Sequence, residues 1–134
     1  MHGSAALTYS VSVVATAALF NLVLTARIML RRAETKIPDG PGDDALLYGR
    51  IRAQANFHEF VPMLLALLVL LAFEGANVRW LYGIAGLLLV LRLSHIVGMD
   101  RPSPNAFRSV GALGTWLLTA AIPAWALIAC SSSL

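Results

Sequence analysis

Polar side chains occur at helical spacing inside one largely apolar stretch of this chain. Arg52, Asn56 and Glu59 stand at i, i+4 and i+7, so a helix would place them on one face, and Gln54 lies between them in the sequence. The stretch then runs without a break into the apolar residues 60–73. Polar residues of both charge signs are costly in a bilayer and usually face a bundle interior or a wet cavity. We therefore predict a functional site on this segment.

Three further groups of polar residues accompany other apolar segments. Arg92 and His95 stand at i and i+3 in the third segment. Arg108 and Ser109 open the fourth segment, and Arg31 closes the first. If the four segments cross a membrane in alternating directions, all these residues lie at nearly one depth. The pattern predicts one shared pocket.

The residue types in this set indicate an anion-binding pocket that contains one acid. Arginine binds carboxylates in bidentate fashion, and the amides of Gln54 and Asn56 can both donate and accept. Glu59 would hold an ammonium group or neutralise an arginine. An arginine beside a thiol would favour the thiolate, which is the reactive form of sulfur. A ligand with two carboxylates, an ammonium and several amides would suit the set.

Composition restricts the class of protein. Of 134 residues, 58% are hydrophobic and 13% are charged, and the mean hydropathy is +0.74. Such a chain is an integral membrane protein of one domain, residues 1–134. The net charge of +3 comes from basic residues that flank apolar segments, which excludes a nucleic-acid partner. The single cysteine, Cys130, rules out an internal disulfide, and no metal-binding cysteine pattern is present.

Four membrane helices are expected, at about residues 5–30, 45–73, 78–99 and 104–130. The outer two are free of charge over a full membrane span, whereas the middle two carry arginine or glutamate within it. The middle helices should therefore hold the chemistry and the outer two the scaffold. Ser103 is the expected N-cap of the last helix, with Pro104 at its first position.

The distribution of basic residues predicts the orientation. Nine of the ten lysines and arginines fall on the side of the first and third connections, and Arg79 is the exception. By the positive-inside rule both termini are non-cytoplasmic. The small residues Gly83 and Gly86 in the third helix, and Gly111 and Gly114 in the fourth, permit close helix approach.

Three motifs together resemble one family. The run Arg52-Ala-Gln-Ala-Asn-Phe-His-Glu59 with Pro62 is similar to the second-helix signature of the membrane-associated proteins in eicosanoid and glutathione metabolism, the MAPEG family. Arg92-Leu-Ser-His95 and Arg108-Ser-Val110 resemble the family's third- and fourth-helix patterns, and Arg31-Arg32-Ala33 resembles some members. The resemblance covers nearly the whole chain.

The resemblance implies an all-α integral membrane four-helix bundle that assembles as a homotrimer, with glutathione as co-substrate between subunits near the cytoplasmic side. It implies a glutathione transferase or peroxidase that acts on an apolar small molecule or lipid in a bacterial inner membrane. The implied role of Arg108 is to stabilise the thiolate, with Ser109 as a hydrogen-bond donor to the thiol. The residues implied to bind glutathione are Arg31, Arg52, Gln54, Asn56, Glu59, Arg92 and His95.

Two positions depart from the eicosanoid-making members, because Met99 and Ala112 stand where those members carry tyrosine. This chain is more similar to the small bacterial members. Two alternatives stay open. One is a small proton-coupled transporter that uses Glu59, and the other is a non-catalytic membrane scaffold of the same fold. Arg52 with Glu59 could also form a purely structural ion pair.

Overall fold

The chain folds into four long helices in a computed structural model that describes residues 2–132. They are α1 (His2–Thr35), α2 (Ala45–Phe73), α3 (Val78–Met99) and α4 (Ala106–Ser132). Each is long and apolar enough to cross a membrane. The expected all-α architecture with four spanning helices is confirmed. The first helix is longer than expected and continues one turn past residue 30.

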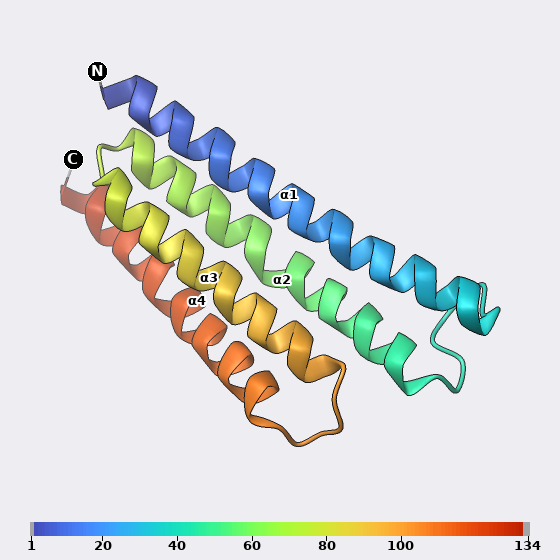
Figure 1. Cartoon of the computed structure of the whole chain (residues 1–134). Helices are drawn as coiled ribbons and strands as arrows, with labels where there is room; N and C mark the ends of the chain where they lie inside the picture. Colours follow the sequence, from blue (N-terminus) through green and yellow to red (C-terminus); the bar gives the residue numbers. More distant parts are fainter. Residues whose placement is uncertain (1, 133–134) are drawn as a thin grey trace.

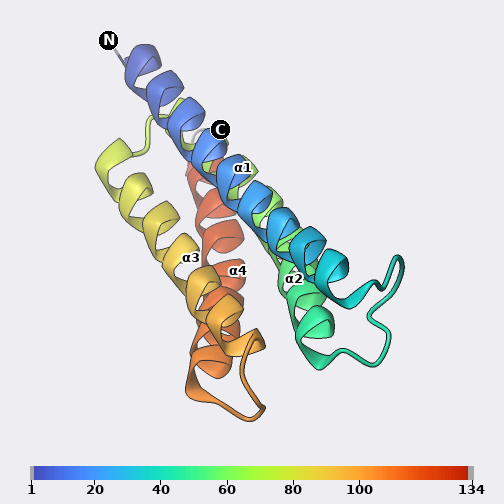
Figure 2. The ribbon, with the colours of Figure 1, turned by 45° about the vertical axis from the view of Figure 1, so that its right-hand side comes forward.

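The helices pack side by side with their directions alternating, as Figure 1 shows. The α1–α2 and α3–α4 connections lie at one end of the bundle, and the chain enters and leaves at the other. In Figure 2, α1 crosses in front, α2 and α3 flank it, and α4 lies behind. Across the described residues α1 contacts α2 and α3 but not α4. The bundle therefore has separate α1–α2 and α2–α4 faces.

Side-chain caps fix where α2, α3 and α4 begin. Asp44 accepts from the backbone N–H of Leu47 and Asn77 from that of Arg79. Asn105 accepts from the N–H of Arg108 at 3.0 Å. Each cap satisfies a backbone donor that has no partner within its helix.

The expected cap of the last helix was wrong. That helix begins at Ala106, not at Pro104, and its cap is Asn105 instead of Ser103. The Asn105 amide also donates to the carbonyl oxygens of Gly98 and Pro102, at 2.9 and 3.0 Å. These two extra bonds hold Asn105 at the start of the helix, and Ser103 has no comparable contacts with the end of α3.

The buried core lies mainly between α1, α2 and α3. Phe20 on α1 stacks on Phe57 on α2 with ring centroids 5.4 Å apart, and Leu68, Leu81 and Leu88 are fully buried. Many large apolar side chains on the outer faces are exposed instead, among them Leu19, Leu22, Leu117, Leu127 and Ile128. An exposed apolar surface on this scale is suited to lipid and not to water.

Glycines bring α3 and α4 into backbone contact at the end that carries the connections. A Cβ on Gly98 would collide with the backbone of Arg108, and a Cβ on Gly111 with the backbone of His95. Gly114 packs on the side chain of Leu91. The expectation for Gly111 and Gly114 is confirmed.

Gly83 and Gly86 make no close helix contact within the described chain. Neither glycine has a neighbouring atom within 4 Å of its Cβ position. Gly86 instead borders a groove that is lined by Ser12, Val13 and Thr16 of α1.

Candidate functional site

A polar groove lies between α2 and α4, floored by the end of α3. Its volume is about 210 Å³. Four of the residues singled out in the sequence line it, namely Arg52, Asn56, His95 and Arg108. Its remaining lining residues are Tyr48, Met99, Ala112 and Trp116.

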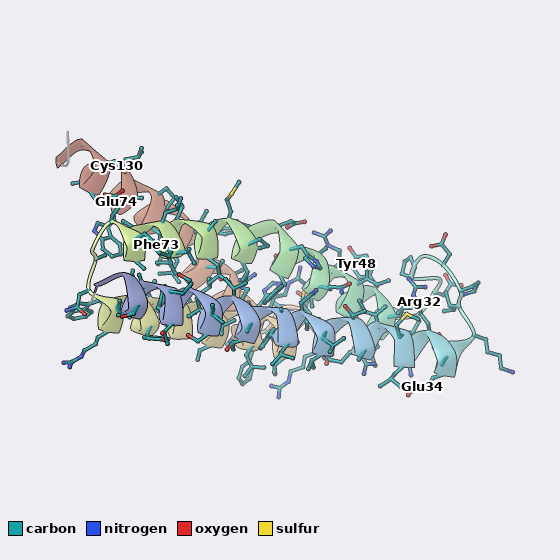
Figure 3. All side chains as sticks on the ribbon, turned by 90° about the horizontal axis from the view of Figure 1, so that it is seen from above. Arg32, Glu34, Tyr48, Phe73, Glu74 and Cys130 are labelled. Atoms are coloured by element: carbon teal, nitrogen blue, oxygen red, sulfur yellow. The ribbon has the colours of Figure 1, made fainter. Side chains whose placement is uncertain are left out.

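Helix α2 supplies one wall of the groove through residues spaced four apart. Tyr48, Arg52 and Asn56 fall on one stripe of the helix, because residues at i and i+4 are neighbours on a helix surface. Tyr48 lies in the half of the bundle that also holds Arg32 and Glu34, as Figure 3 shows. The guanidinium of Arg52 forms no hydrogen bond or ion pair with any described residue. It is therefore available to a ligand.

Arg108 faces Arg52 across the groove from the first turn of α4. Its backbone N–H is bound by the Asn105 cap, and its exposed guanidinium has neither a hydrogen-bonded nor an ion-paired partner in the part of the chain that the structure describes. Two unpaired guanidinium groups in one groove favour binding of an anion with more than one negative group.

Side chains of α3 bind backbone carbonyls of α4 and so fix the position of Arg108. Arg92 Nη2 donates to the carbonyl of Gly111 at 2.6 Å, and Ser94 Oγ donates to that of Phe107 at 2.9 Å. The ring nitrogen Nδ1 of His95 lies 3.4 Å from the carbonyl oxygen of Arg108. Together with the glycine contacts, these bonds tie the start of α4 rigidly to α3.

Arg92 lies beneath α4 and does not line the groove. It is 2% exposed, and its guanidinium lies 5.8 Å from the ring centre of Phe60 on α2. Its Nε and Nη1 atoms are buried and unpartnered among the described residues. Burial of an arginine with so few partners is costly. Within this chain Arg92 supports α4, and a bound ligand would not touch it in the groove as it stands.

Two other expected site residues point elsewhere. Ser109 is exposed, and its hydroxyl donates to the carbonyl of Asn105 at 3.2 Å, within its own helix. Glu59 is exposed on α2 and does not line the groove. The structural ion pair considered for Arg52 and Glu59 does not form between them in the described chain.

Arg31 and Gln54 lie on the α1–α2 face. Arg31 donates to Asp44 through Nη2 at 2.7 Å and Nε at 3.3 Å, and to Glu34 at 3.0 Å. Gln54 donates to the hydroxyl of Thr25 on α1 at 2.6 Å. These contacts close the connection between α1 and α2, and the Arg31 guanidinium holds the pKa of the Asp44 carboxyl below its usual range.

Arg31 and Arg108 therefore face different sides of one chain. Gln54 follows Arg52 by two residues, and two residues rotate a helix by about 200°, so their side chains point to opposite sides of α2. The helices α1 and α4 do not contact each other over residues 2–132. A single copy of the chain therefore does not place all the expected binding residues around one bound molecule.

Two aromatic residues of the groove were missed by the sequence analysis. Tyr48 precedes Arg52 by one helical turn, and Trp116 follows Ala112 by one turn. The i, i+4 spacing from Arg52 was a usable signal for Tyr48. No comparable signal marked Trp116, since tryptophans are also common at membrane interfaces.

The fold and the groove define an integral membrane protein with four spanning helices and a cationic site where three of them meet. The chain belongs to the MAPEG family, whose sequence profile matches residues 10–128. That match includes every residue that lines the groove. No curated protein and no solved structure matches the chain.

Proposed function

We propose that this protein is a glutathione-dependent transferase or peroxidase that acts on apolar electrophiles or lipid hydroperoxides within the membrane. The observation that carries the proposal is the groove between α2 and α4, where Arg52, Asn56, His95 and Arg108 converge. Membership of the MAPEG family supports the choice of glutathione.

Glutathione has two carboxylates, an ammonium group, two amides and a thiol, and the groove offers partners for several of them. Arg52 binds a carboxylate and Asn56 an amide of the peptide backbone. Arg108 faces the thiol and stabilises the thiolate by its positive charge. Ser109 would have to leave its helix carbonyl before it could bind the thiol.

The site is completed by a second copy of the chain in a homotrimer. Arg31 and Gln54 would come from the α1–α2 face of one copy, and Arg52 and Arg108 from the α2–α4 face of its neighbour. The separation of these residues on two faces of one chain supports this arrangement. Glu59, which is exposed and has no cationic partner in the described chain, would gain one at the same interface.

An apolar substrate reaches the sulfur from the lipid. The apolar part of the groove lining is Met99, Ala112 and Trp116. Trp116 is 61% exposed, so its ring is accessible from the bilayer. Aromatic rings at Tyr48 and Trp116 take the place of the tyrosines that Met99 and Ala112 replace.

The protein lies in a bacterial inner membrane with both termini non-cytoplasmic. Both connections that carry the basic residues are at the end of the bundle that holds the groove, and by the positive-inside rule this supports a groove on the cytoplasmic side. Glutathione would then be taken from the cytoplasm.

The direct test compares wild-type protein with Arg108→Ala in detergent, measuring the ultraviolet absorbance of the thiolate after glutathione is added. Loss of the guanidinium should lower the thiolate yield by about 100-fold, as removal of one charge-stabilising donor does in other enzymes. Glutathione affinity should fall much less, because Arg52 and Asn56 remain. Arg79→Ala is the matched control, since it removes the same charge at the opposite end of α3.

Equal thiolate yields in Arg108→Ala and wild type would reject the assignment. Glutathione binding without thiolate or turnover would favour the non-catalytic scaffold. Proton-driven uptake into liposomes that disappears in Glu59→Gln would favour the transporter.

A further inference from the structure

His95 lies where α2, α3 and α4 meet, and its two ring nitrogens have different surroundings. The side chain is 5% exposed and lines the groove together with Arg108. Its Nδ1 faces the carbonyl oxygen of Arg108 at 3.4 Å. A carbonyl oxygen only accepts, so Nδ1 carries the hydrogen, and in a neutral imidazole Nε2 then has a free lone pair.

The Nε2 atom is buried and has no hydrogen-bond partner in the described part of the chain. Buried polar side-chain atoms are nearly always paired, so an unpaired acceptor beside a binding groove calls for an explanation. A donor brought by the ligand is the simplest one, and the thiol of glutathione is such a donor.

The other lining residues offer no comparable base. Arg52 and Arg108 have no lone pair to give, and neither the amide of Asn56 nor the hydroxyl of Tyr48 is basic. Ser109, the residue expected to bind the thiol, is hydrogen-bonded within its own helix. Among the residues that line the groove, His95 is the one whose side chain has a basic lone pair.

We propose that Nε2 of His95 is the general base that takes the thiol proton of bound glutathione. This inference rests on the proposed function. The S–H bond breaks, its electron pair stays on sulfur, and an N–H bond forms at Nε2. Arg108 balances the new charge on sulfur. When the sulfur attacks an electrophilic carbon, the leaving group or the anion of the adduct takes the proton back from Nε2.

The charges around His95 favour this order of events. Arg92 on α3, Arg108 on α4 and Arg52 on α2 all face this region, and Tyr48 is the other titratable group in the groove. Three guanidinium groups make this region strongly positive before glutathione binds. Proton transfer from a thiol creates the thiolate and the imidazolium together, and the thiolate offsets the added positive charge.

His95→Asn separates the two nitrogens. The Asn amide can still donate to the Arg108 carbonyl as Nδ1–H does, but it has no basic atom in place of Nε2. His58→Asn is the matched control, because His58 is exposed on α2 and does not line the groove. His95→Gln serves as a second variant if His95→Asn does not fold, and the size of each purified oligomer and its glutathione Kd report on folding.

The experiment follows thiolate absorbance by stopped flow from pH 5.5 to 8.5 after mixing protein with glutathione. In His95→Asn the rate of thiolate formation should fall by about 100-fold, the lower range for loss of a general base, with Kd changed by less than about threefold. The increase of the rate with pH should also become shallower in His95→Asn. In His95→Ala, added imidazole should restore part of the rate, which a merely structural role of His95 would not allow.

The outcomes separate this inference from the proposed function. An unchanged rate in His95→Asn, with thiolate still lost in Arg108→Ala, would overturn the role of His95 and leave the glutathione enzyme intact. If wild-type protein neither binds glutathione nor forms thiolate, the proposed function fails, and the inference fails with it.

Discussion

Gly111 marks the closest approach of α4 to α3, and an alanine there would displace the helix that carries Arg108. The added Cβ would lie 2.5 Å from the backbone nitrogen of His95 and 2.6 Å from the carbonyl oxygen of Leu91. Ordinary van der Waals contact begins at 3.4 Å. Because both obstacles belong to the backbone or lie next to it, no side-chain rotation can relieve them. The two helices must separate.

The required shift is roughly 1 Å, and displacements of that size at a catalytic group cost about 10²-fold in rate. The stability effect has two parts. Overpacking costs about 1–3 kcal/mol, and the higher helix propensity of alanine returns about 1 kcal/mol. We therefore expect Gly111→Ala to destabilise the protein by about 1 kcal/mol and to lower glutathione turnover by about 100-fold.

Gly83→Ala is the matched control, because its Cβ has open space around it on the same helix pair. It should stabilise the protein by about 1 kcal/mol through propensity alone and leave turnover unchanged. Thermal unfolding in detergent and steady-state turnover measure both effects. Equal stability changes of the same sign in the two variants would show that close packing at Gly111 does not position Arg108.

Three further changes test the supports of the site. Asp44→Asn keeps the helix cap but removes the charge that binds Arg31. Folding lowers the pKa of Asp44, so the wild-type unfolding temperature should be highest near pH 7 and decline as pH falls below about 4. The unfolding temperature of the variant should decline less over the same range, and equal declines in the two proteins would contradict this. Asn105→Ala removes the cap that binds the N–H of Arg108 and should cost about 1 kcal/mol in thermal unfolding; no change would mean that water replaces the cap. Arg92→Met should leave stability unchanged or raise it by about 1 kcal/mol, because one hydrogen bond repays little of the cost of burial, whereas a loss of about 3–5 kcal/mol would reveal a carboxylate partner outside the described chain.

The sequence allowed the helices to be predicted well but not the faces through which they pack. Hydropathy and length located all four spans, because in a bilayer every spanning segment must satisfy its own backbone and avoid charge. The start of the last helix was harder to place. Residues 102–105 contain two cap-competent side chains, Ser103 and Asn105, and the choice of Asn105 depends on its bond to the end of α3.

The polar residues were identified by type, and only the packing shows how they divide. Arg52 and Asn56 share the groove, yet Arg92, one turn from His95 on α3, lies beneath α4. Residues three apart on a helix point in directions that differ by about 60°. That difference decides between a ligand-facing and a buried position only when the neighbouring helix is known. The same limit applies to Gly83 and Gly86, because a small residue permits a close helix contact but does not specify one.

In the proposed trimer, the division of the arginines between two faces of the chain would allow two inactive variants to repair each other. A copy with Arg31→Ala retains Arg108, and a copy with Arg108→Ala retains Arg31. In a closed ring built by repeating one head-to-tail interface, each site draws on two different copies. Co-expressed in equal amounts, the two inactive chains would rebuild about one quarter of the sites, because each of the two positions is filled correctly half of the time. Activity that emerges only from the mixture would locate the boundary between subunits inside the site itself.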